Sequence, residues 1–292
     1  MKQIRSFLFV PGNKLSWIEK CHQSGADAVI LDLEDSVPPD GKSQAREIVA
    51  SQIAALAEAG QRVYVRINKG AFLYSMKDLE AVMQPGLEGI VLPKPNGPED
   101  VDTANTMMSE MESNSGLPIG STGLIPTLET ANALMRAHEI ATRQRVTAII
   151  CASARNGDVA RSVGYQWTRQ GLESLHFKSS AVIAARAAGK NAIAGLWQEV
   201  KDLEGLAESL GMHRQLGFMG EILIHPSHVA TANAAYSPSE EDVRYYSGMI
   251  AAFELATSQG RAATIYEGEH IDHAHVATAR SILGQIQAGA PR

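Results

Sequence analysis

The chain has 292 residues, with 26 Lys and Arg against 32 Asp and Glu, so its formal net charge at pH 7 is −6. Hydrophobic residues make up 45% and charged residues 20%, a globular composition that excludes disordered, fibrous and disulfide-rich chains. The acidic balance argues against nucleic-acid binding, so we expect a small-molecule partner. Cys21 and Cys151 lie far apart, which predicts neither a disulfide framework nor a cysteine-rich zinc site.

No membrane segment is predicted, because no apolar run approaches the roughly 18 residues needed to span a bilayer. The opening stretch MKQIRSFLFVPG has too few consecutive apolar residues to form the hydrophobic region of a signal peptide. We therefore expect a cytoplasmic protein in a reducing compartment.

Strand-like and helix-like stretches alternate along most of the chain. Strand candidates begin near Ile4, Asp27, Arg62, Glu88, Ile119, Val146, Asn191 and Glu221. Amphipathic stretches between them predict helices over residues 42–59, 98–115, 130–144 and 171–188. Strands such as DAVILDL and VTAIICA are continuously apolar, as burial on both faces of a parallel sheet requires. This βα order predicts an α/β fold, the closed (β/α)₈ TIM barrel.

An open doubly wound sheet is the competing architecture, but it usually carries a glycine-rich phosphate turn after its first strand. The turn here reads VPGNK and has one glycine, which indicates a tight βα turn. The repeat ends near Tyr236, so residues 1–236 are predicted to form the catalytic barrel. Residues 237–292 are predicted to form a C-terminal helical extension, with a helix over 240–258, a loop over 260–271 and a last helix from about His273.

Charged residues follow five consecutive predicted strands, at the end of a barrel where catalytic residues gather. They are Asp32, Glu34 and Asp35 after the second strand, Arg66 after the third, Lys94 after the fourth, Glu129 after the fifth and Asp158 after the sixth. These residues predict a site at one rim of the barrel.

Glu129 and Asp158 leave neighbouring strands, so their carboxylates could meet around one cation. Two carboxylates without a nearby imidazole suit a hard ion, Mg²⁺ or Mn²⁺. The alternative is that Glu129 caps the helix starting at Thr130 and Asp158 caps the short helix behind it.

Arg66 offers a planar fork for a substrate carboxylate, and we place Glu34 with it as a substrate-binding candidate. The alternative for Arg66 is a salt bridge to the acidic cluster, because three like charges in one turn repel unless they are paired. Lys94 lies in a Pro-Lys-Pro loop and could simply be solvated.

The histidines do not predict a transition-metal site, because they lack cysteine partners and an HExxH frame. The groups in question are His225 with His228, and His270 with His273 and His275. No GxSxG motif is present either, so acyl-enzyme hydrolysis is not supported.

An ordered series of motifs resembles the citrate lyase β-subunit-like proteins of the HpcH/HpaI aldolase family, which are CoA-ester lyases. The motifs run nearly end to end and include RSFLFVPGNK, GADAVILDLEDSV, VRIN, GIVLPK, GLIPTLET, NGDVARSVG, LGFMGEILIHPSHV and EGEHID. The resemblance implies a Mg²⁺-dependent lyase that cleaves or forms a carbon–carbon bond in a 3-hydroxyacyl-CoA such as malyl-, citramalyl- or citryl-CoA. Two alternatives are an aldolase for free 2-oxo acids, and a non-catalytic oxo-acid-binding protein or lyase-complex subunit.

The resemblance also implies residue roles. Glu129 and Asp158 resemble the metal ligands, Arg66 the contact to substrate carboxylate and enolate, and Asp272 the catalytic acid/base on a C-terminal lid. In related proteins this lid reaches a neighbouring subunit, which implies a homo-oligomer, a trimer or a dimer of trimers. The alternative for Asp272 is a cap of the helix that begins at His273.

Two positions depart from the family pattern. Many relatives carry Gly-Ala-Glu before the metal-binding aspartate, whereas this chain has Arg155, Asn156 and Gly157. Arg155 could bind an additional substrate carboxylate, contact a CoA phosphate or point into solvent. Ala194 stands where relatives often have aspartate at the end of the seventh strand.

Overall fold

The computed structural model describes residues 3–289, with side chains described up to residue 284. Its internal contacts divide the chain into two compact units. Residues 4–233 form the first unit, and the residues from 234 onward, with Gln3, form the second.

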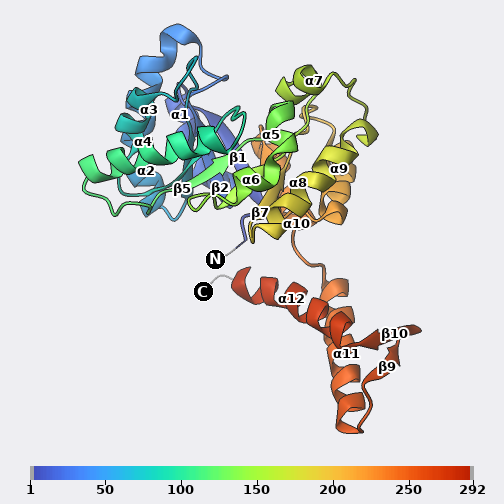
Figure 1. Cartoon of the computed structure of the whole chain (residues 1–292). Coiled ribbons are helices and arrows are strands. Elements are labelled where there is room, and N and C mark those ends of the chain that lie inside the picture. The colour runs from blue at the N-terminus through green and yellow to red at the C-terminus, as the bar shows by residue number, and fades with distance from the viewer. Residues whose placement is uncertain (1–2, 290–292) are drawn as a thin grey trace. The chain divides into compact units, whose positions relative to one another are not determined.

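The first unit is a barrel of eight parallel strands (Figure 1). The strands are β1 Ser6–Pro11, β2 Ala28–Asp32, β3 Arg62–Arg66, β4 Leu87–Leu92, β5 Gly123–Pro126, β6 Ala148–Ile150, β7 Asn191–Ala194 and β8 Gly220–Leu223. Hydrogen-bonded neighbours follow the order β5-β4-β3-β2-β1-β8-β7-β6, and parallel bridges from Leu124 to Val146 and from Thr127 to Ile150 join the two ends. The predicted TIM barrel is confirmed.

Helices connect the strands and surround the sheet (Figure 1). They are α1 Leu15–Ile18, α2 Lys42–Glu58, α3 Met76–Val82, α4 Pro98–Asn114, α5 Ala131–Met135, α6 Ala137–Ala141, α7 Asp158–Val163, α8 Leu175–Ala187, α9 Leu203–Leu216 and α10 Val229–Ala235. Short 3₁₀ turns lie at η1 Cys21–Ser24, η2 Pro39–Gly41, η3 Leu172–Ser174 and η4 Pro226–His228. The predicted helix over 130–144 is two short helices, because Arg136 between them leaves helical geometry with φ −107° and ψ 21°.

The barrel interior is filled by apolar side chains from all eight strands. They are Phe7, Ala28, Ile30, Tyr64, Val91, Ile125, Ala148, Ile150, Ile193 and Ile222. On β2 the alternate residues Val29 and Leu31 are fully buried as well, which explains why this strand reads as one continuous apolar run. The packed interior leaves space for polar chemistry only at the rim.

A buried ion pair ties α4 to the loop before β6. Arg145 donates to Glu112 at 2.7 and 3.0 Å, and Glu112 also accepts the backbone N–H groups of Gly120 and Thr122. The side chains of both partners are almost completely buried.

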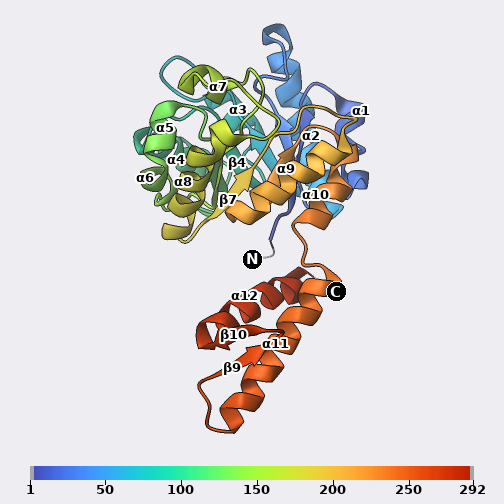
Figure 2. The ribbon, with the colours of Figure 1, turned by 90° about the vertical axis from the view of Figure 1, so that its right-hand side faces the viewer.

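The second unit contains α11 Glu240–Ser258, β9 Ala263–Tyr266, β10 Glu269–Asp272 and α12 His273–Gly289 (Figure 2). Ser239 and Asp242 form a capping box at the start of α11. The predicted loop over 260–271 is wrong, because β9 and β10 pair as an antiparallel hairpin. Glu267 and Gly268 both have positive φ, as a two-residue turn between paired strands requires.

Helix α12 packs along α11, and a small apolar core lies between the helices and the hairpin. Its buried members are Met249, Ile271 and Ala279. In the described residues, no helix combines the length and the apolar character that a membrane crossing needs.

Candidate active site

A cavity of about 400 Å³ opens at the C-terminal ends of the barrel strands. Phe9, Ile150 and Ile222 line its apolar side. Its polar wall comes from five strand ends and their loops, and consists of Asp32, Asp35, Ser36, Arg66, Thr127, Glu129, Asp158 and Gln198. The cavity therefore lies at the rim where barrels of this class carry their chemistry.

Arg66 is fixed in this wall by Asp32. Its Nε and Nη2 donate to the two Asp32 oxygens at 2.7 and 2.8 Å, and its guanidinium carbon lies 4.8 Å from the centre of the Phe9 ring. The two residues meet because they are partners in the parallel β2–β3 ladder. Asp32 takes two of the five guanidinium N–H groups, so Arg66 also keeps donors for a ligand.

Asp32 is the positioning group for Arg66. Burial would raise the pKa of Asp32, but hydrogen bonds from Arg66 and from the Glu34 and Ser36 backbone N–H groups hold this pKa below its ordinary value. The Asp32 carboxylate is therefore ionised and keeps the guanidinium in a fixed orientation.

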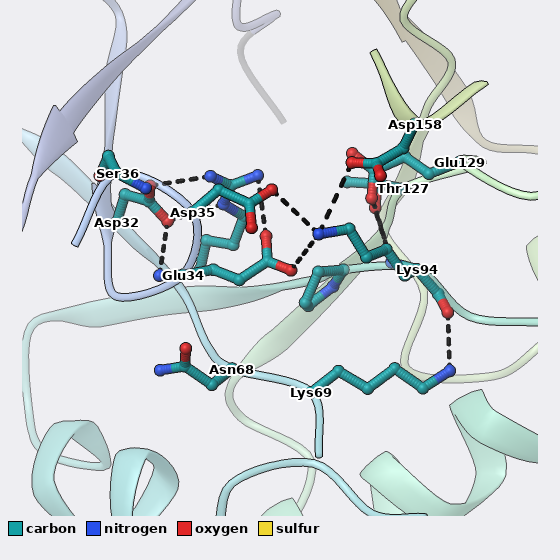
Figure 3. Close-up of polar contacts among 12 residues, drawn as sticks. Asp32, Glu34, Asp35, Ser36, Asn68, Lys69, Lys94, Thr127, Glu129 and Asp158 are labelled. Atoms are coloured by element: carbon teal, nitrogen blue, oxygen red, sulfur yellow. Dashed lines mark hydrogen bonds and ion pairs between the residues drawn. The ribbon is translucent and has the colours of Figure 1, made fainter. Parts of the chain in front are cut away.

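Lys94 is surrounded by carboxylates. Its Nζ lies 2.7 Å from Glu34, 2.9 Å from Asp35 and 3.6 Å from Asp158, and Figure 3 shows its side chain extending between these acids. Burial would lower the pKa of Lys94, but the hydrogen bonds to Glu34 and Asp35 raise it. Lys94 is therefore an ordered cation of the site, and not a solvated surface lysine.

Glu34 connects the two cations. It is buried, and its carboxylate pairs with Lys94 and, at 3.0 Å, with Nη1 of Arg66. Burial raises the pKa of Glu34, although both cations oppose this shift. Glu34 is not among the residues that line the cavity, so its direct contact with substrate stays a prediction.

Glu129 and Asp158 lie next to each other on the cavity wall (Figure 3). Glu129 Oε2 accepts hydrogen bonds from the Thr127 hydroxyl at 2.9 Å and from the Lys94 backbone N–H at 3.1 Å. Both bonds go to Oε2, which leaves Oε1 for another ligand. Asp158 pairs with Lys94 and with Arg161.

Neither carboxylate acts as a helix cap. The side chain of Thr130 caps α5 by accepting the Ala133 N–H, and the N-cap of α7 is Gly157. The capping alternative for Glu129 and Asp158 is therefore wrong, and both acids face the cavity instead.

The Glu129 and Asp158 pair fits a hard divalent cation, because both residues offer only oxygen donors. Burial raises the pKa of Glu129, and the nearby charge of Asp158 raises it further. A bound cation would offset this unfavourable pairing. The described residues hold no cluster of three or more His, Cys, Asp or Glu side chains that could bind a metal, so water and substrate would supply the other ligands, as is usual for Mg²⁺.

Arg155 does not line this cavity. Its guanidinium lies 4.6 Å from the centre of the Trp167 ring and 3.1 Å from Glu199, in a neighbouring pocket. The structure therefore separates Arg155 from the other predicted substrate-binding residues of the rim.

Asp272 belongs to the second unit. Its Oδ1 accepts the Ala274 N–H at 2.9 Å and contacts His275 Nδ1 at 2.7 Å, so it caps the start of α12. The hydrogen bond with His275 is the main cause that lowers the pKa of Asp272. Its catalytic role stays a prediction.

Comparison with known proteins decides the family. The HpcH/HpaI aldolase/citrate lyase family model matches residues 5–226. The chain belongs to this family. The resemblance that the sequence motifs indicate is therefore confirmed.

Named relatives match almost the whole chain. A (3S)-malyl-CoA thioesterase of Cereibacter sphaeroides is 31% identical over 285 residues, covering 97% of this chain and 95% of the relative. The citrate lyase subunit beta of Haemophilus influenzae is 28% identical over 289 residues, covering 99% of both. A crystal structure of CitE from Mycobacterium tuberculosis in complex with magnesium, acetoacetate and coenzyme A has 26% identity and a TM-score of 0.78, with 98% of each chain covered.

Sequence reasoning gave too little weight to Lys94 and missed Thr127 and Gln198 as residues of the site. A lysine between two prolines at a strand end was the available signal for Lys94, because prolines stiffen the loop that carries it. Thr127 sits beside Glu129 in the PTLET motif, but the sequence does not show which hydroxyl meets which carboxylate. Gln198 follows β7 and is itself uncharged, so a search for charged residues at the strand ends does not find it.

Proposed function

We propose that this protein is a Mg²⁺-dependent carbon–carbon lyase for a 3-hydroxyacyl-CoA thioester such as malyl-, citramalyl- or citryl-CoA. The observation that supports it most is one cavity that combines the Glu129 and Asp158 pair with an arginine anchored by Asp32. The family match supports the same reaction class.

In the proposed cleavage the 3-hydroxyl group loses its proton as the C2–C3 bond breaks. The electron pair of that bond moves to the thioester half and forms an enolate, and the other half becomes a 2-oxo acid. The enolate carbon then takes a proton and gives acetyl-CoA. A bound Mg²⁺ would act as a Lewis acid on the oxygen that becomes the carbonyl of the 2-oxo acid.

The residues of this chain have distinct tasks in the proposal. Arg66 presents a fixed positive charge where the enolate develops, and Asp32 keeps its fork aligned. Lys94 adds a second cation and balances the acids around the site. Glu34 positions both cations by holding them at fixed distances.

Asp272 is the proposed proton carrier. Its lowered pKa keeps it ionised at neutral pH, the form that accepts a proton, and partial desolvation under a closed lid would raise this pKa so that it can also return one. We further propose that residues 1–236 form the catalytic domain, and that residues 237–292 act as a lid on a neighbouring subunit of a trimer or a dimer of trimers.

The proposed location is cytoplasmic, where acyl-CoA esters and free thiols such as Cys21 and Cys151 are common.

The test is a product analysis. Purified protein is incubated with malyl-, citramalyl- and citryl-CoA, with Mg²⁺ or with a chelator, and acetyl-CoA, free CoA and 2-oxo acid are quantified separately. We expect equal amounts of acetyl-CoA and 2-oxo acid, formed only with the metal. Absence of both products with every thioester, and of condensation in the reverse direction, would contradict the proposal.

The relatives named (3S)-malyl-CoA thioesterase favour a second candidate function, hydrolysis of the thioester. Water would then add to the thioester carbonyl and release free CoA and a hydroxy dicarboxylic acid. In the same assay, free CoA without acetyl-CoA or 2-oxo acid would identify this activity. A mixture in which acetyl-CoA appears first and free CoA later would indicate lyase and thioesterase steps in succession.

A further inference from the structure

A second pocket of about 280 Å³ adjoins the active-site cavity, and we call it the tryptophan pocket. It is formed by the loops after β6 and β7 together with Trp167. The lining residues are Arg155, Asn156, Trp167, Trp197, Gln198 and Glu199. Gln198 also lines the active-site cavity, so its side chain is the shared wall between the two spaces.

The groups in this pocket are ordered by contacts with one another. The Arg155 backbone N–H donates to Oε1 of Gln198 at 2.7 Å, and the Arg155 guanidinium lies over the Trp167 ring. The centres of the Trp167 and Trp197 rings are 5.9 Å apart. The pocket thus combines two indole rings, two amides, a guanidinium and the carboxylate of Glu199.

The Arg155 guanidinium can still donate to an acceptor in the pocket. The Arg155 side chain is about half exposed, and Glu199 contacts only one of its nitrogens, Nη2, at 3.1 Å. Trp197 is 5% exposed, and its Nε1 is buried without a hydrogen-bond partner among the described residues. Because the Trp197 N–H is buried, the donors that a ligand in the pocket can reach are those of Arg155.

The chemistry of these groups selects a carboxylate at the end of a short apolar arm. Indole rings contact methylene groups well, and a guanidinium recognises a carboxylate through paired N–H donors. One carboxylate can use the Arg155 nitrogens that Glu199 leaves free, whereas a polyanion would place more negative charge beside Glu199. The limited volume also suits a side arm better than a whole nucleotide.

The position of the pocket indicates which half of the substrate it would receive. Arg155 lies three residues before Asp158 in the same loop. An arm that enters past Gln198 is therefore attached to the part of the substrate held near Asp158, which in the proposed function is the 2-oxo acid. Arg155 does not line the main cavity, so an arm must extend past Gln198 to reach it, which favours an arm longer than that of oxaloacetate.

We propose that the tryptophan pocket binds the second carboxylate of a 2-oxo dicarboxylic acid whose two carboxylates are separated by a longer arm, as in 2-oxoglutarate or 2-oxoadipate. This inference rests on the proposed function, because it extends the substrate from the same site. It makes Arg155, Trp167 and Gln198 specificity-determining residues. In the matching thioester, the carbon that bears the hydroxyl group would also carry an arm that ends in a second carboxylate and is longer than the corresponding arm of citryl-CoA.

The test measures binding of the free acids by calorimetry in the presence of Mg²⁺. The acids are pyruvate, 2-oxoglutarate and 2-oxoadipate, and CoA alone is a separate arm. For the wild type we expect at least one long dicarboxylate to bind about tenfold more tightly than pyruvate. Arg155→Met keeps the apolar stem and removes the charge, so the ratio of affinities should fall about fivefold or more toward unity.

A second readout uses the tryptophans. In Trp17→Phe, the remaining Trp167 and Trp197 both line the pocket, so ligand-induced change in their emission reports its occupancy. Trp17 lies in α1 and lines neither the pocket nor the cavity. We expect 2-oxoglutarate or 2-oxoadipate to change the emission more than pyruvate does.

The outcomes separate this inference from the proposed function. Equal affinities of the wild type for pyruvate and both dicarboxylates would overturn the inference and leave the lyase proposal standing. An equal loss of affinity for all three acids in Arg155→Met would do the same. Loss of affinity for CoA alone in Arg155→Met, with unchanged ratios for the acids, would assign the pocket to the cofactor half and also overturn it. If no 2-oxo acid binds in a Mg²⁺-dependent manner, the proposed function and the inference fail together.

Discussion

The Nζ atom of Lys94 lies 3.6 Å from the Asp158 carboxylate, so a lysine occupies the position next to a proposed metal ligand. The same ammonium group lies 2.7 Å from the buried Glu34. Lys94 therefore stabilises one acid of the site and competes with a divalent cation for another.

Replacing Lys94 should separate these two effects. In Lys94→Met, we expect Mg²⁺ to bind more tightly, because a competing charge is gone, and the free energy of unfolding to fall by about 1–3 kcal/mol, because Glu34 loses a hydrogen-bonded ion pair. Calorimetric Mg²⁺ titration and denaturant unfolding measure the two changes. The double variant Lys94→Met with Glu34→Gln should recover stability, and Lys201→Met, an exposed lysine, is the control. Weaker Mg²⁺ binding in Lys94→Met would contradict the competition.

Asp158→Asn should remove metal binding while leaving the barrel folded. Mg²⁺ should raise the melting temperature of the wild type by mass action, and this rise should be absent in the variant. Thermal unfolding with Mg²⁺ or a chelator measures it. Asp102→Asn, at an exposed acid on α4 that pairs with Arg143, is the matched control and should keep the full rise. An equal rise in Asp158→Asn would remove this residue from the site.

Arg66→Lys should separate the effect of the planar guanidinium geometry from the effect of its positive charge. The lysine keeps a positive charge but cannot hold both Asp32 oxygens as the guanidinium does. We expect kcat to fall about 100-fold, with a similar loss in Asp32→Asn through misplacement of Arg66. Steady-state kinetics of the double variant should show much less than the product of the two losses. Fully multiplicative losses would mean that the residues act independently.

Asp272→Asn and Asp272→Ala together should separate capping from catalysis. Asparagine is also a good N-cap, so Asp272→Asn should keep the melting temperature but lose activity, since an amide cannot carry the proton. Asp272→Ala should lose activity and also lower the melting temperature, because the start of α12 loses its cap. Full activity in Asp272→Asn would limit Asp272 to its cap of α12.

The buried pair of Glu112 and Arg145 should make stability depend on acid pH. Burial would raise the pKa of Glu112, but Arg145 and the N–H groups of Gly120 and Thr122 hold this pKa below its ordinary value. The pair therefore stabilises the fold above the ordinary glutamate pKa of about 4.3, and this contribution is lost as the pH falls through the lower pKa of the folded state. At neutral pH, Glu112→Gln should cost about 3–5 kcal/mol, because Arg145 stays buried without its partner.

Denaturant unfolding across the acid range measures this dependence. The difference between the wild type and Glu112→Gln should shrink as Glu112 of the wild type takes up its proton. Glu110→Gln, at an exposed acid on the same helix, should show no such trend. A difference that stays constant from neutral to strongly acidic pH would contradict the assignment.

The sequence predicts the barrel well because its strands are buried on both faces and read as unbroken apolar runs. Strand β5 is the least well placed, since the expected start near Ile119 lies in an exposed turn and the strand begins at Gly123. The hairpin β9–β10 was missed because its turn, Glu267 and Gly268, lies between strands of only four residues. Short strands of this kind give little periodicity to read.

The sequence predicts those residues of the site whose position follows from backbone topology. It does not predict the direction in which a side chain points. Glu129 and Asp158 follow adjacent strands, so topology brings them to one rim. The direction of Arg155 depends on the ring of Trp167, which lies twelve residues further along the chain. The placement of Lys94 likewise depends on three acids from two separate loops.

The filled interior of the barrel has a consequence for the order of events during turnover. A stack of apolar side chains from all eight strands closes the lower end, so the active-site cavity is reached from the rim side of the barrel. Substrates would enter and products would leave through the same side of the cavity. A product bound deepest in the cavity would block binding of the next substrate until it dissociates. Inhibition by the deeper product should therefore be competitive with the incoming thioester.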